Sequence, residues 1–175
     1  RRLTYSLPVG ASALAASSLD VERWTQLPES AGPLPDPVDP AQVPFAPPDY
    51  GTAYAALKQF YERYPCQVRL NAETGLPSFL SGQLQEPQPG ATPIEAAERF
   101  LRTQELMLTG RHAGTQVTRV RETDWRDGTY QILFLQTNRS NLPVYGGAVA
   151  CTFNADGWLV LVTSTLYPVT AAEID

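Results

Sequence analysis

A run of prolines near the N-terminus places the strongest limit on how this chain can fold. The run comprises Pro28, Pro33, Pro35, Pro37, Pro40, Pro44, Pro47 and Pro48. Proline fixes φ and has no backbone N–H, so this stretch cannot form a helix or a central strand. We therefore expect residues 1–48 to form a largely extended, polyproline-like arm, with Trp24 and Phe45 available to hold it on the surface of a single domain formed by residues 49–175.

Charge and histidine content exclude several classes of function. Thirteen basic and 18 acidic side chains give a net charge of −5 at pH 7. The basic residues form no cluster, and phosphate binding needs one, so nucleic acid is not an expected partner. No apolar run reaches the roughly 18 residues of a membrane-spanning helix. With one histidine and two cysteines, the chain lacks the ligands of the common zinc sites, and we expect no cofactor.

The first segment after the arm is predicted to be a helix followed by a hairpin. Asp49 can act as the N-cap, and Pro65 is expected to end the helix. Apolar residues recur between them at steps of three and four, which is the helical period: Tyr50, Ala53, Leu57, Phe60 and Tyr64. Residues 67–70 and 76–82 are predicted strands, joined by a turn at 73–75.

A second helix is predicted to begin at Thr92 and to end at Gly110. Thr92 is a suitable N-cap, Pro93 occupies the first helical position, and Glu95 completes a capping box. Glycine after the last turn is a common stop signal. One broad apolar face is formed by Ile94, Ala97, Phe100, Leu101 and Leu108.

Beyond residue 115 the apolar period changes to two, which predicts strands. The predicted strands are 116–122, 130–135, 144–154 and 158–167, with Asp-Gly turns at 127–128 and 156–157. The strand 130–135 is apolar on both faces, which favours a central position. Helices followed by a run of antiparallel strands indicate an α+β fold, with one or two helices packed on one face of an antiparallel sheet.

No set of residues stands out for catalysis. A nucleophilic pair would need Cys66 or Cys151 beside His112, which is flanked by glycines in a predicted loop where an exposed, non-catalytic role is favoured. Three acidic residues near a hairpin turn, Glu122, Asp124 and Asp127, more often form turns than the carboxylate pair of a glycosidase. The sequence also lacks the G-x-S-x-G, P-loop and G-x-G-x-x-G motifs. We therefore expect a protein that is not an enzyme.

The two cysteines leave two alternatives open. They lie 85 positions apart, and a disulfide between Cys66 and Cys151 in a secreted protein would contribute about 4 kcal/mol in the chain-entropy model. Alternatively, both are buried free thiols that act as small apolar side chains. The sequence Asn138-Arg139-Ser140 also matches the glycosylation sequon and lies in a predicted exposed loop.

The C-terminal half shows an ordered series of motifs. A glutamine is followed by a Leu-Pro-Val-Tyr-Gly segment, an alternating strand, an Asp-Gly turn, a second apolar strand and a closing proline. The residues concerned are Gln136, Leu142, Pro143, Val144, Tyr145, Gly146, Asp156, Gly157 and Pro168. This series resembles the fungalysin/thermolysin propeptide (FTP) domain. Residues 74–77 and 79–82 resemble that family's opening hairpin and 93–101 its helix, so the likeness spans roughly residues 66–168.

Local backbone chemistry accounts for parts of this pattern. Leu142-Pro143 favours an extended entry into the strand. Gly146 and Gly147 remove side chains where another backbone or a bulge approaches. Asn141 stands where the FTP family often has glycine, and asparagine tolerates left-handed backbone best among the other residues.

The resemblance implies a function as well as a fold. FTP domains form the N-terminal part of propeptides of secreted thermolysin-like zinc metalloproteases, where they help the catalytic domain fold and keep it inactive until cleavage. It implies a secreted, non-catalytic pro-domain that binds a metalloprotease catalytic domain in cis or in trans. The loop expected to contact the partner contains Asn138, Asn141, Leu142 and Pro143. The alternative is a free-standing extracellular module of the same fold that binds a protein or peptide, with the arm as a spacer or ligand.

Overall fold

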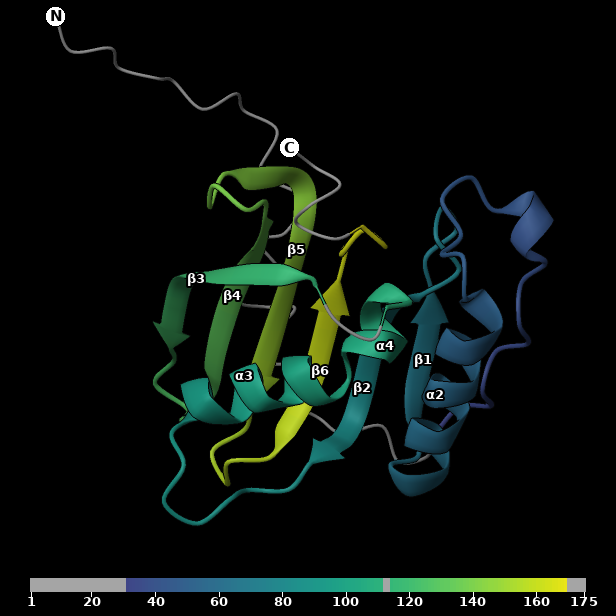
Figure 1. The fold of residues 1–175 in the computed structure, drawn as a ribbon. Coiled ribbons are helices and arrows are strands. Elements are labelled where there is room, and N and C mark those ends of the chain that lie inside the picture. The colour runs from purple at the N-terminus through teal and green to yellow at the C-terminus, as the bar shows by residue number, and fades with distance from the viewer. Residues whose placement is uncertain (1–30, 112–113, 170–175) are drawn as a thin grey trace, which may run out of the picture.

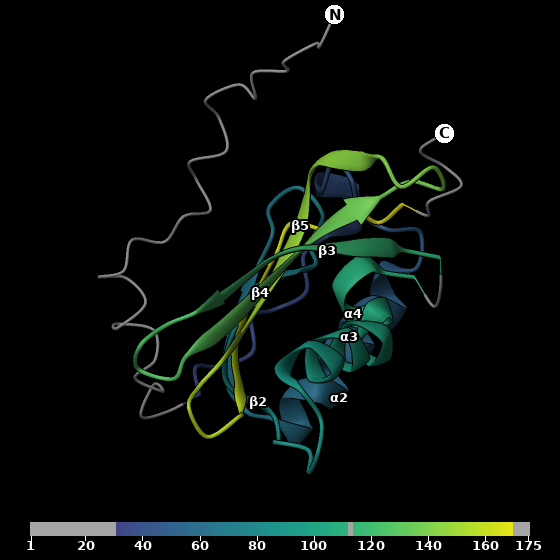
Figure 2. The same cartoon turned by 90° about the vertical axis from the view of Figure 1, so that its left-hand side faces the viewer.

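The computed structural model describes residues 31–111 and 114–169. Within these ranges, six strands form one antiparallel sheet, and three α-helices pack on one of its faces (Figures 1 and 2). The helices are α2 (Tyr50–Arg63), α3 (Pro93–Thr103) and α4 (Glu105–Thr109). The predicted α+β class is confirmed. No described helix has both the length and the apolar character needed to cross a membrane.

The strands follow each other in space in the order β1-β2-β6-β5-β4-β3. They are β1 (Cys66–Leu70), β2 (Pro77–Gln85), β3 (Gln116–Asp124), β4 (Tyr130–Thr137), β5 (Pro143–Phe153) and β6 (Leu159–Ser164). The predicted hairpin of β1 and β2 is confirmed. The last strand, β6, lies between β2 and β5, so it joins that hairpin to the C-terminal strands. The strand predicted to be central, β4, is an inner strand but lies next to the edge strand β3.

The helices begin and end close to the predicted positions. α2 follows Asp49 and stops at Tyr64, although the Asp49 side chain makes no capping hydrogen bond. α3 has the full capping box: the Thr92 hydroxyl accepts from the Glu95 N–H, and the Glu95 carboxylate accepts from the Thr92 N–H at 2.8 Å. These bonds lower the pKa of Glu95. The predicted single helix is interrupted at Gln104, and its second part, α4, ends at Gly110 with a φ of 69°.

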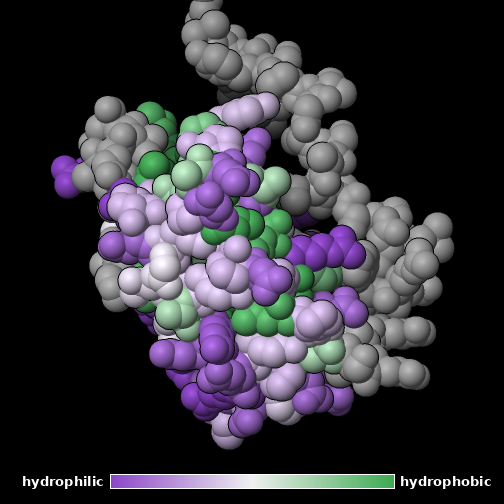
Figure 3. Space-filling view, turned by 90° about the vertical axis from the view of Figure 1, so that its right-hand side faces the viewer, coloured by the Kyte–Doolittle hydropathy of each residue, from purple (hydrophilic) through white to green (hydrophobic). Residues whose placement is uncertain are grey.

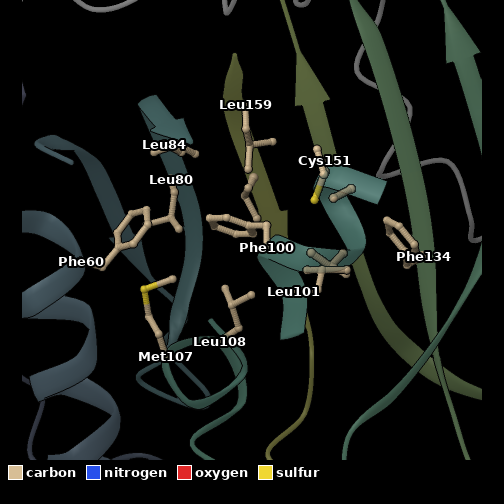
Figure 4. Close-up of a cluster of buried hydrophobic side chains, with 14 of the residues drawn as sticks. Phe60, Leu80, Leu84, Phe100, Leu101, Met107, Leu108, Phe134, Cys151 and Leu159 are labelled. Carbon is tan, nitrogen blue, oxygen red and sulfur yellow. The ribbon is translucent and has the colours of Figure 1, made fainter. Parts of the chain in front are cut away.

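The core lies between the helices and the sheet. Phe100 of α3 is 2% exposed, and its ring meets the ring of Phe60 from α2 edge-on, with 5.9 Å between centroids. Figure 4 shows these rings among Leu80 and Leu84 of β2 and Met107 of α4. Side chains from both ends of the described sequence therefore share one apolar cluster.

The described part of the arm, residues 31–48, lies along α2 and is held there by tyrosines. The Tyr61 hydroxyl donates to the carbonyl of Gly32 at 2.7 Å, and the Tyr54 hydroxyl donates to the carbonyl of Pro35 at 2.5 Å. The Tyr50 hydroxyl accepts from the backbone N–H of residue 38 at 3.0 Å. Burial, reinforced by the charge of a nearby carboxylate, raises the pKa of Tyr54. Residues 31–48 are therefore part of the folded domain.

The arm was predicted to be largely extended, and its described part contains one short 3-10 helix, Pro40–Gln42, capped by the side chain of Asp39. Phe45 contacts the domain through its backbone N–H, which donates to the carbonyl of Glu73 at 2.8 Å, while 55% of its surface is exposed. Trp24 and the rest of residues 1–30 lie outside the described residues. Figure 3 shows the side of the molecule that carries α2 and the arm, where hydrophobic patches appear among mostly hydrophilic residues.

Candidate functional site

Neither cysteine is placed to act as a nucleophile. Cys66 in β1 and Cys151 in β5 are free thiols, 1% and 0% exposed. Burial raises the pKa of each thiol to about 12. The thiolate is the reactive form, so both groups are chemically inert near neutral pH. His112, the expected partner of such a nucleophile, lies outside the described residues.

The alternative of a disulfide is not realised in the structure. β1 and β5 are separated by β2 and β6, and neighbouring strands lie about 4.8 Å apart. The backbones at Cys66 and Cys151 are therefore separated by about 14 Å across the sheet, whereas disulfide-linked Cα atoms lie within about 7 Å. The second alternative, two buried thiols, is the one that the structure shows.

We expect neither thiol to react with Ellman's reagent in the folded protein at pH 8, because the reagent reaches neither sulfur and little thiolate is present. After unfolding in guanidinium chloride without reductant, two thiols per chain should react. Absence of thiol colour after unfolding would show that a disulfide forms after all.

The same burial predicts a pH dependence of stability. Unfolded cysteine has a pKa of about 8.5, and the folded value is about 12 for both groups. Between these values the unfolded chain loses thiol protons that the folded chain retains. The cysteine contribution to stability is therefore fully present below about pH 8.5 and declines towards pH 12. Denaturant unfolding at pH 8 and pH 10 should show a smaller decline in Cys151→Ala than in the parent protein.

Two of the three acidic residues near the β3–β4 turn have hydrogen-bond or ion-pair partners within the structure. The Glu122 carboxylate accepts a hydrogen bond from the Tyr130 hydroxyl and pairs with Arg119 at 3.1 Å. Asp127 stabilises the turn by accepting from the backbone N–H of Thr129 at 2.9 Å. Within residues 31–111 and 114–169, no group of three or more histidine, cysteine or acidic side chains could hold a metal ion.

The segment that begins β5 has a bulge that exposes an aromatic side chain. Leu135 of β4 pairs with Ala148 of β5, and Thr137 pairs with Pro143. Two steps along β4 therefore correspond to five steps along β5. Gly146, within this bulge, has a φ of 78°, a conformation that favours glycine. Bulges bend a strand and redirect its side chains. Tyr145 accordingly has 92% of its surface in solvent (Figure 1 shows the bend in β5).

A buried glutamine fixes this end of the sheet to the segment that follows β6. The Gln136 Oε1 accepts from the Tyr167 N–H at 2.9 Å, and its Nε2 donates to the carbonyls of Tyr167 at 3.1 Å and Val169 at 3.4 Å. Gln136 is 0% exposed. A Cβ at Gly147 would lie 2.7 Å from Gln136 Oε1. The expectation that the glycine pair makes room at a bulge is therefore confirmed.

The loop between β4 and β5 was predicted to contact a partner, and the structure divides its residues into two groups. Asn138 is only 9% exposed, and its Oδ1 accepts from the N–H groups of Ser140 at 3.0 Å and Leu142 at 2.8 Å. Asn138 therefore shapes the loop. The sequon was predicted to be exposed, but its asparagine is buried. Asn141, Leu142 and Pro143 are exposed. Asn141 has a φ of 58°, which confirms its left-handed backbone.

Exposed apolar side chains gather beside this loop. A shallow groove of about 550 Å³ lies between the arm, the bulge of β5 and the segment after β6. Of the described large hydrophobic residues that are exposed, Phe45 and Tyr145 line the groove, and Leu142 lies in the adjoining loop, three positions before Tyr145. We call this surface the apolar end, which comprises Phe45, Ala46, Leu142, Val144, Tyr145, Tyr167, Pro168 and Val169. Its side chains are apolar or aromatic, and their only polar groups are the hydroxyl groups of Tyr145 and Tyr167.

Sequence reasoning found only part of the apolar end. Leu142 and Pro143 were predicted contacts, and Tyr145 was recognised as part of a motif but not as an exposed residue. Phe45 and Tyr167 come from segments more than 100 residues apart, and only the folded arm brings them together. An aromatic residue beside paired glycines, as in Tyr145-Gly146-Gly147, is the signal that indicates an exposed bulge.

Comparisons with known proteins establish no family for this chain. No protein-family model matches the sequence, and no curated protein matches it. Among solved structures, the chain is similar to the Bacillus megaterium YpeB C-terminal domain, with a TM-score of 0.42 and 10% sequence identity. The likeness covers 68% of this chain and 64% of that chain. Because no family model matches, the FTP assignment stays a prediction.

Proposed function

We propose that this chain is a non-catalytic protein-binding domain, and specifically the pro-domain of a secreted zinc metalloprotease that assists folding of the catalytic domain and inhibits it. The observation that carries the binding role is the apolar end, where Tyr145 is 92% and Leu142 62% exposed. The ordered motifs shared with FTP domains, from Gln136 to Pro168, support the finer assignment.

The apolar end has the composition of a binding surface. Tyrosine and other aromatic residues are enriched among the residues that contribute most to protein interfaces, because they bury a large rigid area when the partner excludes water. A partner covering about 800 Å² of this domain would be of standard size for a stable complex. Gln136 fixes the backbone of Tyr167 against the sheet, so this part of the apolar end needs little backbone rearrangement on binding.

A free-standing extracellular binding module would use the same surface. In that case the groove of about 550 Å³ would take a short apolar segment of a protein or peptide. The proposed role of the arm as a spacer gains no support from its described part, because residues 31–48 pack along α2. We therefore favour the pro-domain.

The proposal predicts that the reading frame beyond residue 175 encodes a domain with an HExxH motif. That catalytic domain, unfolded and then refolded with this purified chain in trans, should regain more activity than when refolded alone. The chain should also inhibit the native catalytic domain. The double variant Leu142→Ala/Tyr145→Ala should weaken inhibition by about tenfold or more, since interface anchors each contribute about 1 kcal/mol or more.

The matched control is Val120→Ala, which trims a half-exposed apolar side chain on the edge strand β3 outside the apolar end. Its inhibition constant should stay within about twofold of the parent value. A stop codon or an unrelated domain after residue 175 would exclude action in cis, and failure to assist or inhibit any secreted metalloprotease in trans would then refute the pro-domain. Inhibition that is insensitive to the double variant would refute the proposed surface. Capture of a different extracellular protein that needs Tyr145 would support the free-standing module.

A further inference from the structure

A second hollow lies on the helical side of the molecule, between α2 and the α3–α4 pair. Its volume is about 600 Å³, and it shares no lining residue with the groove of the apolar end. Its floor is closed by buried apolar side chains, among them Phe60, Leu84, Phe100 and Met107. Figure 4 shows these four side chains close together in the layer between the helices and the sheet. We call this hollow the interhelical groove.

The rim of the interhelical groove has an unusual charge composition. The 14 described residues that line it include two arginines, Arg63 and Arg99, together with four glutamines and one threonine. None of these 14 residues is an aspartate or a glutamate. The whole chain has 18 acidic and 13 basic residues. The lining of the groove therefore has a positive charge, opposite in sign to the net charge of the chain.

The polar groups of this rim are largely unsatisfied within the described residues. Arg63 lies over the ring of Tyr64, 5.1 Å from its centroid, and makes no ion pair with any residue of 31–111 or 114–169. Arg99 forms neither a hydrogen bond nor an ion pair in the described ranges, although its charge helps to lower the pKa of Glu95. Of the four glutamine side chains, only Gln85 has a hydrogen bond there, from its Nε2 to the carbonyl of Ala96 at 3.2 Å.

We propose that the interhelical groove binds an extended, acidic segment of a partner polypeptide. A guanidinium can form two parallel hydrogen bonds with a carboxylate, so Arg63 and Arg99 would each take one acidic side chain. Glutamine side chains carry both a donor and an acceptor, as peptide groups do, and suit an extended backbone. Half-buried Tyr64 and Leu106 offer apolar contact for the residues between the acidic ones.

Other ligands with negative charge fit this groove less well. The floor residues Phe60, Leu84, Phe100 and Met107 are at most 5% exposed, so no channel is open for the alkyl chain of a fatty acid. Two arginines in a chain with a net charge of −5 are too few for a nucleic acid backbone. This binding role is additional to the proposed function, because the apolar end is a separate surface.

The experiment measures fluorescence anisotropy of the labelled octapeptide (Glu-Leu)4 with the full chain, and of (Gln-Leu)4 and (Lys-Leu)4 for comparison. We expect (Glu-Leu)4 to bind at least about tenfold more tightly than either of the others, since hydrogen bonds to charged groups are the stronger ones. The double variant Arg63→Gln/Arg99→Gln should weaken its binding by about tenfold or more. Raising the salt from about 0.05 M to about 0.5 M should also weaken it.

The matched control is Arg121→Gln/Arg126→Gln, which removes the same charge from exposed positions on β3 and its turn, outside the interhelical groove. It should change binding of (Glu-Leu)4 by less than about twofold. No binding at about 1 mM peptide, equal loss in the two double variants, or loss on Leu142→Ala/Tyr145→Ala would overturn the proposal. Displacement of the peptide by dodecanoate, with no effect of Arg63→Gln/Arg99→Gln, would also overturn it.

Discussion

Replacing Phe100 by alanine is expected to lower the free energy of unfolding by about 3 to 5 kcal/mol. The Phe100 ring is 2% exposed and lies at the centre of the layer between the helices and the sheet. Its loss removes the edge-on contact with Phe60, at 5.9 Å between centroids. Leu101 and Met107 are fixed by their own backbones in α3 and α4, so they cannot refill the space. Urea unfolding followed by circular dichroism measures the change.

The control for this prediction is Phe45→Ala, the same substitution at a residue with 55% of its surface exposed. The free energy of unfolding should change by about 0.5 kcal/mol or less, because few contacts are lost. If the two variants lose similar stability, Phe100 is not the central residue of the core. A loss of stability in Phe100→Ala with an unchanged denaturant m-value would show that the altered protein still unfolds as one unit.

Local chemistry explains why much of the secondary structure could be predicted from sequence. The capping box of Thr92 and Glu95, the stop at Gly110 and the end of α2 before Pro65 depend on residues a few positions apart. The left-handed backbone of Asn141 follows from the same kind of reasoning. Such features form wherever the sequence occurs, because they need no contact with distant parts of the chain.

Long-range contacts explain what sequence reasoning missed in the fold. β6 lies between β2 and β5. The alternating pattern of each strand does not determine which strands become neighbours in the sheet. The position of the arm depends on hydroxyl groups of Tyr54 and Tyr61, which lie outside the apolar stripe of α2 and so gave no periodic signal. The break at Gln104 follows from tertiary packing, since no glycine or proline marks it.

The candidate site was predictable to the same limited extent. The loop around Leu142 was identified from its sequence, but Asn138 was assigned to the surface because loops usually are exposed. The Asn138 carboxamide oxygen instead accepts hydrogen bonds from the backbone N–H groups of Ser140 and Leu142, and its side chain is therefore turned into the loop. The exposure of Tyr145 depends on the extra residues of the β5 bulge, which the alternating pattern of the strand does not indicate. The interhelical groove depends on how far apart α2 and α3 pack, which no local motif encodes.

The second large effect is expected at Gln136. Gln136→Ala should lower the free energy of unfolding by about 3 kcal/mol, since three hydrogen bonds of about 1 kcal/mol each are lost in a buried site. The backbone groups of Tyr167 then lack their partner, so hydrogen exchange at the Tyr167 amide should quicken more than at amides in β2. Gln83→Ala, at an exposed position of β2, should cost about 0.5 kcal/mol or less.

Gln136→Glu separates the hydrogen bonds at this position from its packing. The new carboxylate keeps the shape and can accept from the Tyr167 N–H, but it cannot donate to the carbonyls of Tyr167 and Val169. Burial beside these carbonyls must raise the folded pKa above the ordinary value of about 4.3. Below about pH 4.3 the protonated group donates, and the variant should lose little stability relative to the parent. The loss should grow as the pH rises through the folded pKa, because only the unfolded chain ionises freely. If the loss in the free energy of unfolding is the same at pH 4 and pH 7, the Gln136 side chain stabilises the protein through its volume. Its Nε2 donor is then not needed to hold the apolar end.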